Sequence, residues 1–283
     1  MKINKKELKE IFNECTKELI DEHVNIVRNF NSAAKIIEQQ WTSPDDFWWV
    51  KIEQRYKDFR SYNGRRNDIQ FKFWKQINKT DGTNRENHVG YAIIRGNSKE
   101  SAVKCLKNIT VHLNPWAAKS YGQDIVTSEG NSFAIIDVCN LFYARAYMTI
   151  NKRSLKTTVA KARDSKSKGM FKMREFHHAA GQMKVGNDGT HNWEQERPWT
   201  LIDCDIDDTV QQQKLEQFLA DNGIKIDGMD MSHDGKHYYI SDPRVRTLDF
   251  SPFLNAQTNN RPGDPAVLAK GDASMLLYSP CGI

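Results

Sequence analysis

The sequence predicts an α+β protein in which a helical N-terminal region precedes an α/β unit. Apolar side chains near the start of the chain recur every three or four residues, the period of an amphipathic helix. From about residue 88 the apolar runs shorten and alternate with helical segments. With 283 residues, 39% of them hydrophobic, the chain can form a substantial core. We therefore expect residues 1–87 to form a helical, basic-aromatic accessory region and residues 88–283 an α/β domain.

The N-terminal region divides at a proline. The helical period runs from Lys5 to about Gln40, which is enough for one long helix or two short ones. Pro44 cannot continue a helix, so Thr42–Asp46 is predicted to end one and begin another element. The segment from Phe47 to Lys79 is crowded with aromatic and basic residues, and a polar loop follows it.

The later part of the chain alternates strands with helices. Short strand-type runs occupy residues 89–94, 109–113, 133–138 and 144–150. Helices are predicted at Ser98–Asn108 and from a cap at Ser154 through Arg163. A strand at Thr200–Ile206 and a helix at Thr209–Asp221 follow. The last predicted hairpin has the strands Ile224–Ser232 and Lys236–Ser241, which flank a glycine turn.

Bulk properties exclude several classes of protein. The five cysteines lie far apart without a CxxC or CxxH pair, so neither a zinc ribbon nor a disulfide framework is predicted. The longest apolar runs fall far short of the roughly 20 residues of a membrane helix. The N-terminus lacks the apolar segment of a secretory signal. We expect a soluble, cytoplasmic protein with no membrane partner.

Two aspartates lie near the end of the predicted strand at Thr200–Ile206. The two-residue period of a strand puts Asp203 and Asp205 on one face. Adjacent carboxylates repel each other, and Mg²⁺ or Mn²⁺ offsets that repulsion while bridging substrate phosphates. Asp203 and Asp205 are therefore candidate metal ligands and catalytic residues. The alternative is that both are solvated at the end of a strand, because short DxD patterns are common.

The hairpin that follows adds a candidate nucleotide site. If its strands lie beside the acidic strand, His237 approaches the two carboxylates from the same face. Gly235 permits a positive φ in the turn, where an imidazole or a backbone N–H can meet a triphosphate. Ser232, Gly235 and His237 are thus the candidate nucleotide-binding residues, although a single histidine is more often structural.

These two segments resemble a known family. Asp203-Cys204-Asp205 after a hydrophobic run, and Ser232 to His237 before Tyr238-Tyr239-Ile240, resemble the first two motifs of the archaeo-eukaryotic primase (primase-polymerase) superfamily. The resemblance implies a primase-like α/β unit with an RRM-like mixed sheet. It also implies that Asp203 and Asp205 bind the catalytic divalent metals and that His237 contacts the phosphates of a nucleoside triphosphate.

The resemblance covers about Trp199–Asp249 and implies a third carboxylate downstream. Asp249, Asp264 and Asp272 qualify by residue type. Asp249 is favoured as the third catalytic residue because it follows the hairpin closely beside an apolar neighbour. Upstream, Ala144 to Tyr147 together with Lys152 to Ser154 resembles a group of uncharacterised bacteriophage proteins.

A rival interpretation uses overlapping residues. Asp205 to Val210 also resembles the nucleophile loop of haloacid-dehalogenase-type phosphatases, with Asp205 as nucleophile and Asp207 as acid/base. Lys270 would then be the later lysine of such a site. Only 73 residues follow Val210, whereas completing a doubly wound sheet takes several strands with crossovers of about 10–12 residues each. The phosphatase is therefore the alternative to the primase-like enzyme.

Two segments carry much of the positive charge. Residues 51–75 interleave basic with aromatic side chains, which are the ingredients of single-strand binding. Residues 152–174 hold nine basic residues against one acid, Asp164. Nucleic acid is the expected partner, although packed aromatics and a solvated basic loop would produce the same pattern. The candidate nucleic-acid-binding residues are Arg65, Arg66, Lys152, Arg153, Lys156, Lys166 and Lys168.

Together these features predict a metal-dependent nucleotidyltransferase of primase-polymerase type that acts on nucleic acid with nucleoside triphosphates and Mg²⁺ or Mn²⁺. Residues 88–283 would form its catalytic or nucleic-acid-binding domain. The phosphatase, a non-catalytic nucleic-acid-binding protein with the same fold, and a metal-dependent nuclease remain as alternatives.

Overall fold

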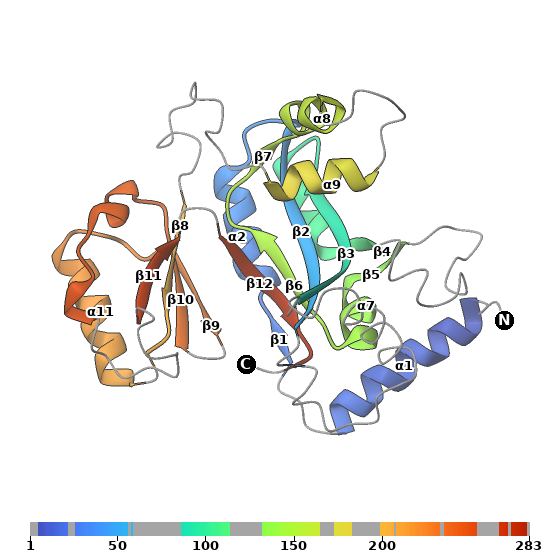
Figure 1. Ribbon diagram of the computed structural model, residues 1–283, viewed down its shortest axis with the longest axis horizontal. Coiled ribbons are helices and arrows are strands. Elements are labelled where there is room, and N and C mark those ends of the chain that lie inside the picture. The colour runs from blue at the N-terminus through green and yellow to red at the C-terminus, as the bar shows by residue number, and fades with distance from the viewer. Residues whose placement is uncertain are drawn as a thin grey trace. The chain divides into compact units, whose positions relative to one another are not determined.

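The structure, a computed structural model, has the α+β architecture that the sequence predicts, with helices and antiparallel strand pairs (Figure 1). It describes residues 5–21, 26–55, 58, 86–113, 132–164, 173–182, 199–206, 208–232, 235–253, 266–270 and 273–281. Two compact units can be distinguished. Unit 1 comprises Met1–Phe30, Trp49–Met148 and Leu276–Gly282, and unit 2 comprises Asn31–Trp48, Thr149–Met275 and Ile283. Neither unit has a boundary near residue 87. Residues 50–53, before that position, pair with residues 145–148, after it.

Most of an eight-stranded sheet belongs to unit 1. Its strand order is β1-β12-β6-β2-β3-β4-β5, and β7 pairs with β2. The strands are β1 (Val27–Arg28), β2 (Asp46–Arg55), β3 (Glu86–Arg95), β4 (Thr110–Leu113), β5 (Ser132–Ala134), β6 (Arg145–Thr149), β7 (Arg153–Ser154) and β12 (Ser274–Ser279). The helices of this unit are α1 (Lys5–Asp21), α5 (Lys99–Lys107) and α7 (Ile135–Phe142), and α1 packs against α7.

Two segments of unit 1 differ from the sequence prediction. The expected strand at 133–138 is β5 only as far as Ala134, and α7 begins at Ile135. Five apolar residues of α7 are buried, and a short apolar run does not distinguish a buried helix from a buried strand. Strand β2 lies within the region expected to be helical. Nearly all of its residues are buried on both faces, so it lacks the alternation that marks a half-exposed strand.

Unit 2 holds most of α2 (Phe30–Gln40), together with α8 (Leu155–Asp164) and α9 (Met173–Gln182), which pack against each other. It also holds a separate four-stranded sheet with the order β11-β8-β10-β9. The elements of this sheet domain are β8 (Thr200–Cys204), α11 (Thr209–Asp221), β9 (Gly228–Ser232), β10 (Gly235–Ile240), η1 (Pro243–Thr247), η2 (Ser251–Phe253) and β11 (Val267–Lys270).

The four-stranded sheet has a split β-α-β topology. The first strand, β8, is central, and β10 lies between β8 and β9 (Figure 1). This is the order of a ferredoxin-like or RRM-like sheet, in which the last strand returns to the free side of the first. Its three pairings are all antiparallel rather than mixed. Two 3₁₀ turns, η1 and η2, stand in the described chain where a second helix would connect β10 with β11.

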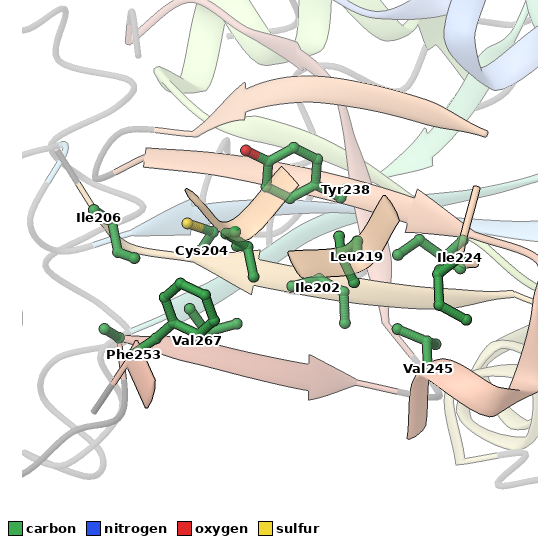
Figure 2. Packing of buried hydrophobic residues seen from close by; sticks show 12 residues of the cluster. Ile202, Cys204, Ile206, Leu219, Ile224, Tyr238, Val245, Phe253 and Val267 are labelled. Carbon is green, nitrogen blue, oxygen red and sulfur yellow. The ribbon is translucent and has the colours of Figure 1, made fainter. Parts of the chain in front are cut away.

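One face of this sheet carries the hydrophobic core of the domain. Ile202 lies opposite Tyr238 and Ala269 across the neighbouring strands, which puts all three side chains on one face. Ile202 and Tyr238 pack with Cys204 and with Leu219 of α11 (Figure 2), and Leu215 and Ala269 pack in the same cluster. Because successive residues of a strand alternate between faces, Asp203 and His237 lie on the opposite face.

Candidate functional site

A row of polar side chains crosses the four-stranded sheet on the face opposite its core. Asp203 of β8 lies directly opposite His237 of β10, and His237 lies directly opposite Asp230 of β9. Directly opposed residues of antiparallel strands have Cβ atoms about 4.5–5.5 Å apart on the same face. Strand register therefore brings together one histidine and two carboxylates from three strands.

Hydrogen bonds join this row into a continuous chain of five side chains. His237 Nε2 lies 3.1 Å from Asp203 Oδ1, and His237 Nδ1 lies 3.1 Å from Asp230 Oδ1. At one end, the Tyr239 hydroxyl donates to Asp230 Oδ2. At the other end, Lys270 Nζ on β11 donates to Asp203 Oδ2. We call this set, Tyr239–Asp230–His237–Asp203–Lys270, the cross-strand row.

The charges within the cross-strand row are complementary. Burial alone would lower the pKa of His237, but its hydrogen bonds to Asp203 and Asp230 and their charges outweigh burial and raise it to about 9. Burial alone would raise the pKa of Asp203, but hydrogen bonds and charges from His237 and Lys270 lower it to about 2. Burial and the neighbouring Asp230 raise the pKa of Tyr239 far above its ordinary value. At neutral pH, Asp203 is a carboxylate, His237 an imidazolium and Tyr239 a neutral phenol.

These pKa shifts predict how stability depends on pH. The folded-state pKa of His237 exceeds its ordinary value of 6.5. The contribution of the charged ring to the free energy of unfolding is therefore complete below pH 6.5 and is lost as pH rises through about 9. Both side chains keep some solvent exposure, 19% for His237 and 16% for Asp203, which screens their interaction. We expect the free energy of unfolding to fall by about 1–2 kcal/mol over this interval. The lowered pKa of Asp203 reflects its contacts with both His237 and Lys270, and the stability that these contacts contribute is lost in acid as pH falls through about 2.

Urea unfolding of the wild type and of His237→Gln at a series of pH values checks this prediction. The wild type should lose stability between about pH 6.5 and 9.5 relative to the variant. Two parallel stability profiles would show that His237 is not the group responsible.

The structure places the other residues predicted from the motifs as follows. Asp205 comes just after β8 and is partly exposed, and its backbone N–H donates to Ala266 O at 2.9 Å. Gly235 begins β10 with φ +155°, and an added Cβ would lie 2.0 Å from Cys204 O. Ser232 pairs with Gly235 at the end of β9, and its side chain lies outside the described atoms. Gly235 thus brings the hairpin against the segment that carries both aspartates.

Asp249, the favoured third carboxylate, occupies an exposed turn between η1 and η2. Its carboxylate accepts hydrogen bonds from Ser251 N at 2.9 Å and Ser251 Oγ at 2.8 Å. These are the contacts of a residue that caps the start of η2. The second carboxylate in the cross-strand row is instead Asp230. Sequence reasoning missed Asp230, although the pairing of Ser232 with Gly235, only three positions apart in the sequence, sets the register that places Asp230 opposite His237.

The candidate nucleic-acid-binding residues are dispersed. Lys152 Nζ lies 3.1 Å from Asp46 Oδ2 and also donates to Thr42. Arg153 is buried, with 6% of its surface exposed, whereas Lys156 is exposed. Arg65, Arg66, Lys166 and Lys168 lie outside the described residues. Within the described part of the chain, Lys156 alone among the seven candidates is both exposed and without a side-chain ion pair.

The cross-strand row can be tested for its fit to a divalent cation. Across the described ranges, no three His, Cys, Asp or Glu side chains form a metal-binding group. Carboxylate oxygens are nevertheless the donors that Mg²⁺ and Mn²⁺ prefer, and each oxygen of Asp203 retains a second lone pair. Lys270 comes from the edge strand β11, and its side chain is 42% exposed on a flexible stem. A divalent cation at Asp203 would therefore have to replace Lys270 at a carboxylate that His237 also contacts.

No protein-family model, curated protein or solved structure matches this chain. None of the described helices combines the length and apolar character needed to cross a membrane. A functional assignment therefore depends on the residues of the cross-strand row and on the topology that positions them.

Proposed function

We propose that the four-stranded sheet domain is the catalytic part of a metal-dependent nucleotidyltransferase of primase-polymerase type. The supporting observation is the 3.1 Å approach of His237 Nε2 to Asp203 Oδ1. These residues come from two separate sequence motifs that resemble the superfamily, and they meet on one face of an RRM-like sheet. Their substrates would be nucleoside triphosphates and a nucleic-acid strand.

The roles of the residues follow from their chemistry. Asp203 and Asp205 would hold Mg²⁺ or Mn²⁺, which when bound would activate a 3′-hydroxyl and stabilise the charge on the departing pyrophosphate. His237 is cationic at neutral pH, because its pKa is about 9, and its Nε2–H, once it leaves Asp203, would donate a charge-assisted hydrogen bond to a phosphate oxygen. Lys270, once released from Asp203, would offer a second cation to the same triphosphate.

The phosphatase alternative loses support from the topology. Haloacid-dehalogenase-type enzymes belong to the doubly wound α/β folds, whose ligands bind at the carboxyl ends of parallel strands. Strand β8, which precedes Asp205, has antiparallel neighbours on both sides, β10 and β11. Asp207 lies outside the described residues, and Asp208 caps α11 by accepting a hydrogen bond from Val210 N.

A non-catalytic nucleic-acid-binding protein is the second candidate. The ion pairs of Asp203 favour it, because His237 and Lys270 already neutralise this carboxylate without a divalent cation. In this case the sheet would bind a strand of nucleic acid in the manner of other RRM-like domains, without chemistry.

An incorporation assay distinguishes these functions. The full chain would be incubated with labelled ribo- or deoxynucleoside triphosphates, a primed or unprimed template, and Mn²⁺, Mg²⁺ or EDTA. We expect incorporation that requires the cation, is lost in Asp203→Asn and is retained in Asp221→Asn, a control at an exposed position of α11. Absence of incorporation with retained nucleic-acid binding would favour the binding protein. Phosphate-ester hydrolysis lost in Asp205→Asn but not in Asp203→Asn would favour the phosphatase.

A further inference from the structure

Asp230 and Tyr239 lie in the cross-strand row but outside the residues that the motif comparison singled out. Asp230 is 6% exposed, and Tyr239 is fully buried. A buried carboxylate destabilises a protein unless hydrogen bonds replace the water it loses. The Tyr239 hydroxyl and the His237 ring supply two such bonds, one to each oxygen of Asp230.

This arrangement determines which hydrogen-bonding role each nitrogen of His237 has. A neutral imidazole has one N–H donor, whereas both nitrogens of an imidazolium are donors and each needs an acceptor. Tyr239 donates to Asp230 Oδ2, which leaves Oδ1 to accept from His237 Nδ1. The Nδ1 atom is thereby occupied on the side of β9, and Nε2 points to β8, where Asp203 lies.

We propose that Asp230, itself held by Tyr239, is a positioning residue that holds the His237 ring through Nδ1, so that Nε2–H can donate to a bound polyphosphate once it leaves Asp203. The same logic governs metal-ligating histidines, whose second nitrogen is held by a carboxylate. The identity of the ligand rests on the proposed function, whereas the positioning of the imidazole rests on the geometry of the row alone.

The arrangement on the strands supports a fixed role for Asp230. Because Ser232 pairs with Gly235 and only two residues separate them, a slip of one residue would move Asp230 to the opposite face. Tyr239 lies two residues beyond His237 on β10, so it projects from the same face and reaches Asp230 diagonally. The backbone thus places Asp230 to accept from the imidazole, and it places Tyr239 to donate to Asp230.

The test measures the ring hydrogens of His237 by ¹H–¹⁵N nuclear magnetic resonance, together with the affinity for inorganic tripolyphosphate by calorimetry. The full chain would be compared with Asp230→Ala, which removes the acceptor, and with Asp230→Asn, which keeps an acceptor oxygen but loses the charge. Asp221→Ala removes an exposed carboxylate elsewhere in the same domain and serves as the control.

In the wild type and in Asp221→Ala, we expect an Nδ1–H signal protected from exchange with water. Asp230→Ala should lose this signal and bind tripolyphosphate about tenfold more weakly, the effect of losing one charge-assisted hydrogen bond. Asp230→Asn should retain the signal in part. If Asp230→Ala does not fold, Tyr239→Phe takes its place, with faster Nδ1–H exchange and a severalfold weaker affinity expected.

An Asp230→Ala or Tyr239→Phe protein whose Nδ1–H signal and tripolyphosphate affinity both equal those of the wild type would overturn the inference. The ring signal is read without nucleotide, template or metal. A chain that shows no incorporation but loses the signal in Asp230→Ala would therefore contradict the proposed function and leave the positioning role of Asp230 intact.

Discussion

Replacing Gly235 by alanine is expected to lower the free energy of unfolding by about 3–5 kcal/mol, because strain and overpacking act together. An alanine Cβ at this position would lie 2.0 Å from Cys204 O and 3.1 Å from Asp205 Cα. Both are backbone atoms, so no side chain can rotate away to relieve the clash. The φ of +155° is also one that residues with a Cβ rarely adopt.

Gly228→Ala provides a matched control within the same sheet. A Cβ at Gly228 would meet the Tyr239 side chain at 3.5 Å, an ordinary van der Waals distance. We expect this variant to change the free energy of unfolding by less than about 1 kcal/mol. Urea unfolding followed by circular dichroism measures both variants, and equal losses would show that the contact with β8 does not constrain residue 235.

The close contact at Gly235 also affects the position of His237 in the cross-strand row. Relief of the clash requires β10 to move away from Cys204 and Asp205, and His237 moves with β10. A shift of β10 would therefore weaken the contact between His237 and Asp203. Gly235 supports the site through packing of backbone against backbone, a role that a glycine in a predicted turn does not by itself reveal.

Much of the four-stranded sheet domain could be predicted from local sequence signals. The strand expected at Thr200–Ile206 is β8, and the helix expected at Thr209–Asp221 has those bounds. Asp208 caps α11 through its side chain, and Gly223, with φ +69°, follows its end. These signals lie within a few residues of the elements that they delimit, which is why sequence reasoning identifies them.

The partners of the catalytic candidates could not be predicted in the same way. Lys270 reaches Asp203 because β11 pairs with β8 across 67 residues of sequence, and no local pattern encodes that pairing. The preference for Asp249 followed from proximity along the chain, whereas Asp230 joins His237 through strand register. The strand β2 was hidden for a related reason, because burial on both faces removes the alternation by which strands are recognised.

Lys270→Met is expected to increase the affinity for Mn²⁺ at least about tenfold, because it removes a positive charge in contact with the Asp203 carboxylate. In the wild type, a divalent cation that binds Asp203 would compete with Lys270 for this carboxylate. The substitution keeps most of the aliphatic stem of residue 270. Because the side chain is 42% exposed, we expect little change in stability.

Calorimetric titration with Mn²⁺ measures this effect against two further variants. Lys225→Met removes the same charge from an exposed position of the domain and should leave the affinity close to that of the wild type. Asp203→Asn removes the carboxylate and should abolish binding at this site. A Lys270→Met protein with unchanged affinity would mean that the cation does not bind Asp203.

Under the proposed function, Lys270 would also link cation binding to triphosphate binding. While Lys270 is paired with Asp203, its positive charge neutralises a carboxylate of the same sheet. A cation bound to Asp203 would free the ammonium group of Lys270, which could then pair with the phosphate oxygens of a bound triphosphate. Tripolyphosphate should therefore bind the wild type more tightly with Mn²⁺ than without it, and Lys270→Met should reduce this gain even though it binds Mn²⁺ more tightly. An equal gain in both proteins would restrict Lys270 to the role of a counter-ion for Asp203.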